Sequence, residues 1–160
     1  MIQAKHLIVK RSTLPDAGKG LFTKIFIPKG SFIIEYRGRV TTWKEVNHDE
    51  GKNGYLFYLK RDHVIDAKPY KRALARYAND AKGLHKIKGI ANNSIYDVAG
   101  SKVYIKAVKD IPAGGEILVD YGKDYWDVIR YNLRIDKKIK SKTKSRSILR
   151  KFRHGHERAA

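Results

Sequence analysis

The segment Gly18-Lys19-Gly20-Leu21-Phe22 is the first place in the chain where residue types and spacing could serve chemistry. Glycines let the backbone approach a ligand closely, and a dinucleotide-binding loop uses them between a strand and a helix. This segment stands before the first strong strand pattern, so it is not a dinucleotide fingerprint. Taken by itself, it predicts a plain turn.

Two other stretches share one plan, and each delivers a tyrosine. Gly30–Tyr36 and Gly115–Tyr121 both have a glycine, a polar residue, an apolar run, an acidic residue and a tyrosine, and both adjoin an Ile-Pro-x-Gly turn. Each therefore predicts a tight turn followed by a strand that is buried on both faces. The alternative is two ordinary hairpin strands that end in an amphipathic residue.

The elements that must position these residues are mostly strands. Three regions are rich in Ile, Val, Phe and Tyr and are interrupted by Pro or Gly: 22–40, 55–67 and 103–121. In residues 102–107 apolar side chains alternate with lysines, which predicts a strand with one wet face. Helical patterns are short and cover 70–78 and, more weakly, 125–133. We therefore expect a mainly β fold with few short helices.

Composition restricts the classes of protein and partner. The 160 residues suit one domain, contain no cysteine for disulfides or thiolate zinc sites, and include no apolar run of membrane-spanning length. Residues 1–9 do not have the pattern of a signal peptide, so export by the usual route is not expected and a reducing interior suits the chain. No membrane partner is expected.

The net charge of +19 is concentrated toward the end of the chain. Residues 136–160 contain ten Lys or Arg and two acidic residues, so this segment carries +8. Such a field favours phosphate backbones or acidic protein surfaces, although a solubilising, disordered end has the same composition. Residues 137–144 lack a core-facing stripe and are expected to be mobile until they meet a partner. We place the domain boundary near Ile135, which gives a domain at 1–135 and a basic, flexible tail at 136–160.

Several segments, taken in order, resemble the motifs of the SET domain from about Lys5 to Trp126. The glycine segment is similar to the opening G-x-G-L-F loop of that family, and Gly115–Gly122 is similar to its closing G-E-E-L-x-x-D-Y-G motif. The other matching segments are Phe32–Gly38 (first tyrosine strand), Val64–Ala67 (a hairpin strand), Arg76–Asp80 (R-F-x-N-H) and Asn92–Tyr96 (P-N-x-x-Y). Six segments in the family's order make the resemblance specific.

The resemblance implies a SET-domain fold of small sheets around a knot-like crossing near the C-terminus. It implies an enzyme that transfers a methyl group from S-adenosylmethionine to a protein lysine. Tyr121 matches the catalytic tyrosine of the family, and Tyr36 and Tyr96 would line the lysine channel with it. The cofactor-binding residues implied are Gly18, Lys19, Gly20, Leu21, Arg76, Asn79, Asp80, Tyr121 and Trp126. Asn93 would belong to the scaffold, as would Glu116 and Asp120.

The chain departs from the family pattern at three points. Asp80 stands where histidine is usual, Asn92 stands where proline is usual, and the gap between Asn79 and Asn93 is long. Cofactor contacts at Asp80 are therefore open. The cysteine clusters that bind zinc in many members are absent, so no metal is expected. The neighbouring Tyr125 and Trp126 would cover the cofactor, wall the channel, or simply pack.

Tyrosines suit this reaction because methyl transfer needs a neutral amine. Lysine has an ordinary pKa of about 10.4, and a shift of roughly three units corresponds to about 4 kcal/mol. A dry channel beside a positive sulfonium disfavours the ammonium form, and tyrosine combines an apolar wall with a hydroxyl tip.

The expected substrates are histones or other basic DNA-associated proteins, with possible nucleic-acid contact through the tail and a cytoplasmic, nuclear or nucleoid location. Two alternatives stand beside the enzyme. A nucleic-acid-binding module would stack bases on the tyrosines and follow phosphates with the tail. A degenerate SET-fold protein would keep the fold as an interaction platform without the activity.

Overall fold

The computed structural model describes residues 1–83 and 86–156, which form two compact units. The first unit is Met1–Gly122 and contains all of the described strands. The second begins at Lys123 and contains one helix, α1 (Lys123–His156). The expected domain boundary near Ile135 falls inside this helix, so the structure shows no break in secondary structure there. The last four residues of the expected tail lie outside the described residues.

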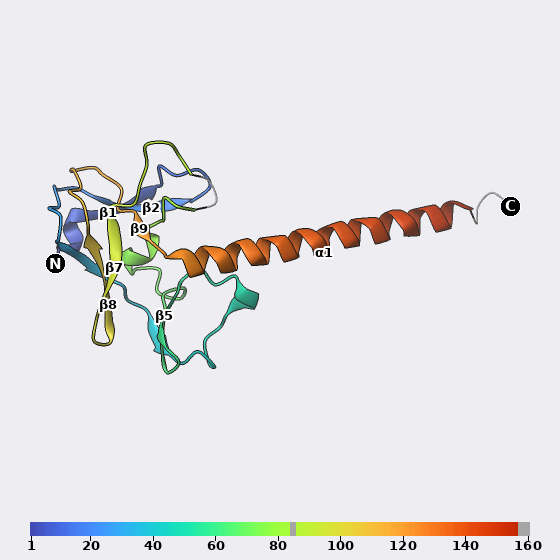
Figure 1. Cartoon of the computed structure of the whole chain (residues 1–160), viewed down its shortest axis with the longest axis horizontal. Helices are drawn as coiled ribbons and strands as arrows, with labels where there is room; N and C mark the ends of the chain where they lie inside the picture. The colour runs from blue at the N-terminus through green and yellow to red at the C-terminus, as the bar shows by residue number, and fades with distance from the viewer. Residues whose placement is uncertain (84–85, 157–160) are drawn as a thin grey trace. The chain divides into compact units, whose positions relative to one another are not determined.

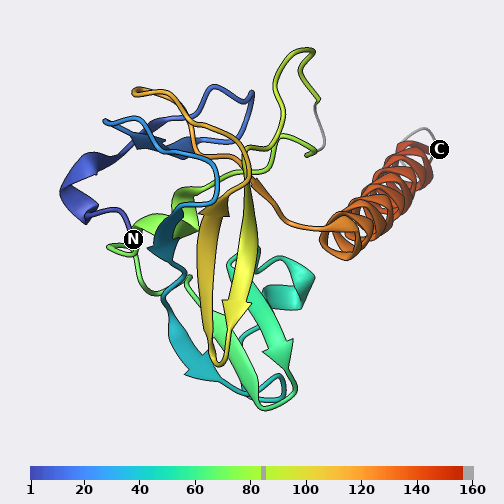
Figure 2. The same ribbon diagram turned by 60° about the vertical axis from the view of Figure 1, so that its left-hand side comes forward.

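Three small sheets make up the first unit (Figures 1 and 2). One pairs β1 (Leu7–Arg11) with β2 (Lys19–Thr23). The second has the order β4-β6-β5, with bounds Arg39–Thr41, His63–Asp66 and Leu56–Lys60. The third has the order β3-β8-β7-β9, with bounds Phe32–Glu35, Lys102–Ala107, Ser94–Ala99 and Val119–Asp120. Three short 3-10 helices lie between them: η1 (Ala4–His6), η2 (Asp49–Gly51) and η3 (Leu74–Tyr77).

The alternating pattern in β8 is confirmed. Val103, Ile105 and Ala107 are buried in the core, while Lys102 is exposed and Lys106 is half-buried on the other face. On that outer face Lys106 pairs with Asp97 of β7. β8 and β7 are the two central strands of the four-stranded sheet, and their hairpin runs through the middle of the first unit (Figure 2).

Two strands were not expected from the sequence. β1 precedes the glycine segment, and β7 covers the second asparagine motif. The glycine segment thus follows a strand, although one without a strong pattern, and it leads into β2 rather than into a helix, so the dinucleotide fingerprint stays excluded. β1 was missed because it is short and three of its five side chains are exposed.

The two tyrosine stretches are only partly alike. Ile117, Leu118 and Val119 are all buried, as expected for the second stretch. In the first, Ile33 is buried but Phe32 is 39% exposed, so burial on both faces is wrong there. Phe32 pairs with Lys106 at the edge of the sheet, where one face meets solvent.

The two helical expectations are corrected by the structure. Residues 70–78 form only the four-residue η3. So short a segment adds too few helical hydrogen bonds to offset the free-energy cost of nucleating an α-helix. At the other end α1 has 34 residues, not one short helix at 125–133. Lys and Arg are good helix formers, and neither Gly nor Pro occurs between Lys123 and His154. Within the described residues no helix combines the length and apolar character needed to cross a bilayer.

The knot-like crossing is built on residues 116–121. On one side Val119 N donates to Asn79 O, and on the other Asn93 N and Ser94 N donate to Leu118 O. The Asn93 side chain reinforces the second contact, because its Nδ2 donates to Glu116 O and its Oδ1 accepts from Leu118 N. Asn93 thus has the scaffold contacts expected of it, and the closing segment is held between two distant parts of the chain.

Candidate active site

Four aromatic side chains converge beside this crossing, and we call them the tyrosine cluster: Tyr36, Phe57, Tyr96 and Tyr121. The Tyr96 ring is at the centre, with its centroid 5.6 Å from Tyr36, 4.9 Å from Phe57 and 6.3 Å from Tyr121. The first two contacts are edge-to-face and the third is stacked, which are the favourable geometries for aromatic pairs. The three tyrosines selected from the sequence are therefore brought together.

Strand ends place these tyrosines. Tyr36 directly follows β3 and donates its backbone N–H to Val103 O of β8. Tyr121 directly follows β9, and Tyr96 lies on β7 between the two edges of the sheet. Phe57 comes from β5 in the neighbouring three-stranded sheet and was not selected from the sequence. Its only sequence signal is that it lies in an aromatic strand pattern.

Both outer hydroxyls of the cluster are held by backbone carbonyls. Tyr36 Oη donates to Tyr55 O at 2.9 Å, and Tyr121 Oη donates to Ala78 O at 2.6 Å. Because each phenol has one proton, these bonds fix the direction of the ring and leave lone pairs on the oxygen. The cluster thus combines apolar walls with oriented acceptor oxygens.

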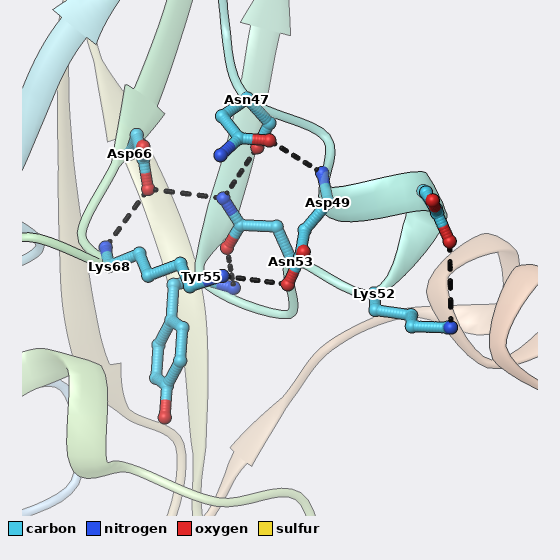
Figure 3. A network of polar contacts seen from close by, with 8 residues as sticks. Asn47, Asp49, Lys52, Asn53, Tyr55, Asp66 and Lys68 are labelled. Atoms are coloured by element: carbon cyan, nitrogen blue, oxygen red, sulfur yellow. Dashed lines mark hydrogen bonds and ion pairs between the residues drawn. The ribbon is translucent and has the colours of Figure 1, made fainter.

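A polar network fixes Tyr55, which in turn holds Tyr36 (Figure 3). Tyr55 N donates to Asn53 Oδ1, and Asn53 Nδ2 donates to Asn47 O and to Asp66 Oδ1. Asp66 also accepts from Lys68 N. Asn53 and Asp66 are both buried, so these bonds satisfy polar groups that would otherwise be costly.

The glycine segment is organised by the buried carboxylate of Glu116. Ser12 Oγ donates to its Oε1 at 2.6 Å, and Thr13 donates to its Oε2 from both backbone N and Oγ1. Gly20 packs so closely that a Cβ there would lie 2.1 Å from Glu116 Oε1. Glycine at this position is thus a packing requirement, and Leu21 beside it is fully buried in the core.

An open cleft with a volume of about 870 Å³ lies against this segment. It is lined by residues 10–16 together with Gly18, Lys19 and Ile87. Gly18 has φ +67° and open space where a side chain would be, which leaves its backbone accessible. Three cationic side chains and one carboxylate line the cleft, so it favours an anionic group.

Residues 78–80 connect the cleft to the tyrosine cluster. Asn79 Nδ2 donates to Lys19 O at 3.0 Å, and the neighbouring Ala78 O accepts from Tyr121. Asp80 is buried and accepts from Tyr121 N through Oδ2 at 2.8 Å. Asn79 and Asp80 therefore lie between the cleft and the tyrosine cluster.

Arg76 and Trp126 have other described contacts. The Arg76 guanidinium lies 4.1 Å from the Tyr55 ring centroid, and its Nη1 donates to Lys68 O. These contacts support the wall around Tyr55 rather than the glycine segment. Trp126 belongs to α1 and packs edge-to-face on Tyr125, with ring centroids 5.1 Å apart. The cofactor roles expected of both stay predictions.

An exposed ion pair adjoins Tyr121 through its sequence neighbour Asp120. Lys82 Nζ donates to Asp120 Oδ2 at 2.5 Å, and this bond lowers the pKa of Asp120 and raises the pKa of Lys82. Asp120 Oδ1 also accepts from Gly122 N. The pair ties the loop after Asp80 to the end of β9, so Asp120 has a scaffold role in the structure.

Comparison with known proteins gives a consistent family. The sequence model of the SET domain matches residues 18–122. The chain is 32% identical over 134 residues to histone-lysine N-methyltransferase EZH2 of Chaetomium thermophilum, covering 76% of this chain and 8% of the relative. It is 30% identical over 121 residues to histone-lysine N-methyltransferase set-17 of Caenorhabditis elegans, covering 73% and 41%. The chain thus spans less than half the length of these curated relatives.

Solved structures show the same architecture. A humanized mutant of the Chaetomium thermophilum Polycomb Repressive Complex 2 bound to the inhibitor GSK126 aligns with a TM-score of 0.59 and 28% identity, over 78% of this chain and 16% of that one. The methyltransferase domain of human PR domain-containing protein 2 aligns with a TM-score of 0.56 at 24% identity, over 74% and 78%, and supports the fold alone. The sheets, the crossing between the two asparagine motifs and the sequence match agree, and the chain belongs to the SET domain family.

Proposed function

We propose that this protein is a protein-lysine N-methyltransferase that uses S-adenosylmethionine as methyl donor. The convergence of Tyr36, Tyr96 and Tyr121 around one aromatic centre carries this proposal, because three phenols from separate strands form the wall that a lysine channel needs. The curated relatives named above are lysine methyltransferases, which supports the same reaction class.

The tyrosine cluster would act on the incoming amine. Apolar ring faces exclude water and disfavour the ammonium form, so the amine enters more readily as the neutral nucleophile. The donor, when bound, supplies an electrophilic methyl group on a positively charged sulfur. The amine, which gives up its proton to solvent on entering the channel, would take the methyl group as the carbon–sulfur bond of the donor breaks.

Tyr121 would position that amine and polarise the transferring methyl. Its hydroxyl donates its proton to Ala78 O, so the phenol oxygen would act toward the substrate as an acceptor for polarised C–H or N–H groups. Tyr36 and Tyr96 would complete the channel wall. The Tyr36 hydroxyl is likewise committed to a carbonyl, which keeps its ring in place.

The cleft at the glycine segment fits the methionine end of the donor. Its volume lies within the range of about 300–1,000 Å³ that is typical of ligand pockets. Lys10, Arg11 and Lys19 would attract a carboxylate, and the open backbone at Gly18 allows close approach. Gly20, Leu21, Asn79 and Asp80 would hold the loop and its neighbours in place. For Arg76 and Trp126 the resemblance alone supports a part in donor binding.

A methyl-transfer assay with labelled donor and basic protein substrates tests the proposal. Tyr121→Phe should lower kcat by at least about 100-fold, since it removes an oriented polar group at the reacting atoms. Tyr77→Phe is the matched control, because Tyr77 Oη also donates to a backbone carbonyl, that of Lys71, but lies outside the tyrosine cluster. Equal activity of the two variants would refute the role of Tyr121.

Donor binding separates the alternatives. A titration of the wild-type protein with S-adenosylmethionine shows no binding if the chain is only a nucleic-acid-binding module. Binding without methyl transfer to any basic protein would identify a degenerate SET-fold protein.

For the substrate we infer a histone or another basic DNA-associated protein, at a nucleoid or in a nucleus. The names of the relatives and the charge of residues 136–160 support this choice. Replacing Lys137, Lys138, Lys140 and Lys142 with glutamine should reduce methylation of DNA-bound substrate and leave free substrate unaffected. Unchanged methylation of the DNA-bound form would refute the contribution of α1.

A further inference from the structure

Asp80 and Asn92, two residues that depart from the family motifs, are bonded to each other. Asn92 Nδ2 donates to Asp80 Oδ1 at 2.7 Å across a separation of 12 residues. The Asn92 amide also accepts from Ala81 N through Oδ1 at 2.8 Å. The Asn92 side-chain amide therefore completes a hydrogen-bonded ring with the carboxylate of Asp80 and the backbone N–H of Ala81.

Three described donors bond to the Asp80 carboxylate. Oδ1 accepts from Asn92 Nδ2 and from Lys82 N at 2.7 Å, and Oδ2 accepts from Tyr121 N at 2.8 Å. The residue is only 5% exposed. A buried carboxylate is tolerated only where such donors compensate its lost hydration, so the arrangement depends on all of these bonds.

Tyr121 is held from two directions by this part of the chain. Asp80 holds its backbone N, and Ala78 O holds its hydroxyl at 2.6 Å. The backbone N and the hydroxyl of Tyr121 are thus bonded to residues 80 and 78, which belong to a single segment. That segment is itself held, because Asn79 O accepts from Val119 N.

We propose that Asp80 and Asn92 form a positioning pair that sets the orientation of the Tyr121 phenol in the lysine channel. This inference rests on the proposed function for its catalytic consequence. Neither residue acts on the substrate. Asn92 supplies the N–H donor that a proline cannot, and Asp80 offers acceptors on both of its oxygens, so each departure suits the other.

The charge and the donor pattern explain why the two residues must match. In Asp80→Asn an NH2 group faces the Asn92 NH2 or the Tyr121 N–H, so at least one donor loses its acceptor. In Asn92→Asp two carboxylates meet. The exchange Asp80→Asn with Asn92→Asp restores one carboxylate and one amide. The amide oxygen introduced at position 80 can then accept from Tyr121 N, but Lys82 N faces the new NH2 group and loses its acceptor.

Steady-state kinetics of the full chain test the pair. Asp80→Asn should lower kcat by about 10- to 100-fold, as expected for a small misplacement of a reacting group, while KM for the peptide changes less than about threefold. The exchanged double variant should recover part of the lost kcat, because it restores the bond to Tyr121 N but not the bond from Lys82 N. Unchanged kcat in Asp80→Asn would overturn the proposal. So would a double variant whose fold loss of kcat is as large as the product of the losses in the two single variants.

A control separates positioning from general stability. Ile27→Val shortens a fully buried side chain at the bridge to Ile111, and Ile27 is not among the described hydrogen-bond partners of Tyr121. It should lower Tm without lowering kcat when the assay is run well below Tm. A kcat loss in Ile27→Val equal to that in Asp80→Asn would show that loss of stability alone explains the effect.

A second readout does not need activity. Hydrogen exchange of the Tyr121 amide, followed by NMR, should be faster in Asp80→Asn and slow again in the exchanged double variant. If the wild-type chain transfers no methyl group, the proposed function fails, yet this measurement still decides the pair. Unchanged protection of the Tyr121 amide would overturn it. Asn92→Ala gives the same test if Asp80→Asn does not fold.

Discussion

The hydroxyl of Tyr121 donates to the carbonyl oxygen of Ala78 at 2.6 Å, across 43 residues of sequence. This bond joins the end of the closing segment to the asparagine motif that also contacts the glycine loop. The proposed catalytic group and the proposed donor site are therefore held by one short piece of backbone, residues 78–80. Changes on either side of that piece should be felt on the other.

Glu116→Gln should loosen the glycine loop. The carboxylate accepts from Ser12 and twice from Thr13, and an amide in its place presents an NH2 group to at least one of those donors. We expect unfolding to become easier by about 1–3 kcal/mol and the Kd for the donor to rise. Urea unfolding and isothermal titration measure the two effects. An unchanged Kd would mean that the loop does not contribute to donor binding.

Gly20→Ala should be more damaging than Gly18→Ala. At Gly20 a Cβ would meet Glu116 Oε1 at 2.1 Å, so the carboxylate must leave its partners. At Gly18 the space is open and only the positive φ penalises a side chain, by roughly 1–2 kcal/mol. Thermal unfolding of both variants should rank them in this order. The reverse order would contradict the close approach of Glu116.

Arg76→Lys should destabilise the wall around Tyr55. The guanidinium both stacks over the Tyr55 ring and donates to Lys68 O, and an ammonium cannot reproduce the planar stack. We expect a loss of about 1–3 kcal/mol in unfolding free energy. Arg72→Lys, at an exposed position on the same segment, is the control and should have little effect.

The Lys82–Asp120 pair predicts a pH dependence. The pKa of Asp120 is lowered from 3.8, so its stabilising contribution is present above pH 3.8 and is lost as pH falls through the folded pKa. The pKa of Lys82 is raised from 10.5, so its contribution is present below pH 10.5 and is lost as pH rises through the folded pKa. Stabilisation by the pair is therefore complete only between these limits.

Asp120→Asn tests this dependence. The amide keeps an acceptor for Gly122 N and removes the charge beside Lys82. The Tm difference from wild type should be small, because the pair is largely exposed. It should be constant at intermediate pH and should shrink as the pH falls through the folded pKa of Asp120 or rises through that of Lys82. Lys82→Met should show the same profile. A difference that does not vary with pH would rule out the ion pair as its cause.

Local sequence patterns determined much of the fold. The alternation in residues 102–107 predicted which face of β8 is buried, because side chains in a strand point to opposite faces. The order of the motifs indicated the family, and the matched residues 18–122 agree with it. The charge of the chain end is also a property of the sequence alone.

Other features were decided by tertiary structure. Phe57 joins the tyrosine cluster because β5 belongs to a neighbouring sheet, and no local pattern records which sheets meet. α1 lacks the apolar stripe from which a helix is usually recognised, so its length was underestimated. Asp80 and Asn92 look like two separate departures in the sequence. They become partners only when the chain brings residues 12 positions apart to hydrogen-bond distance, since side-chain complementarity is a property of position in space.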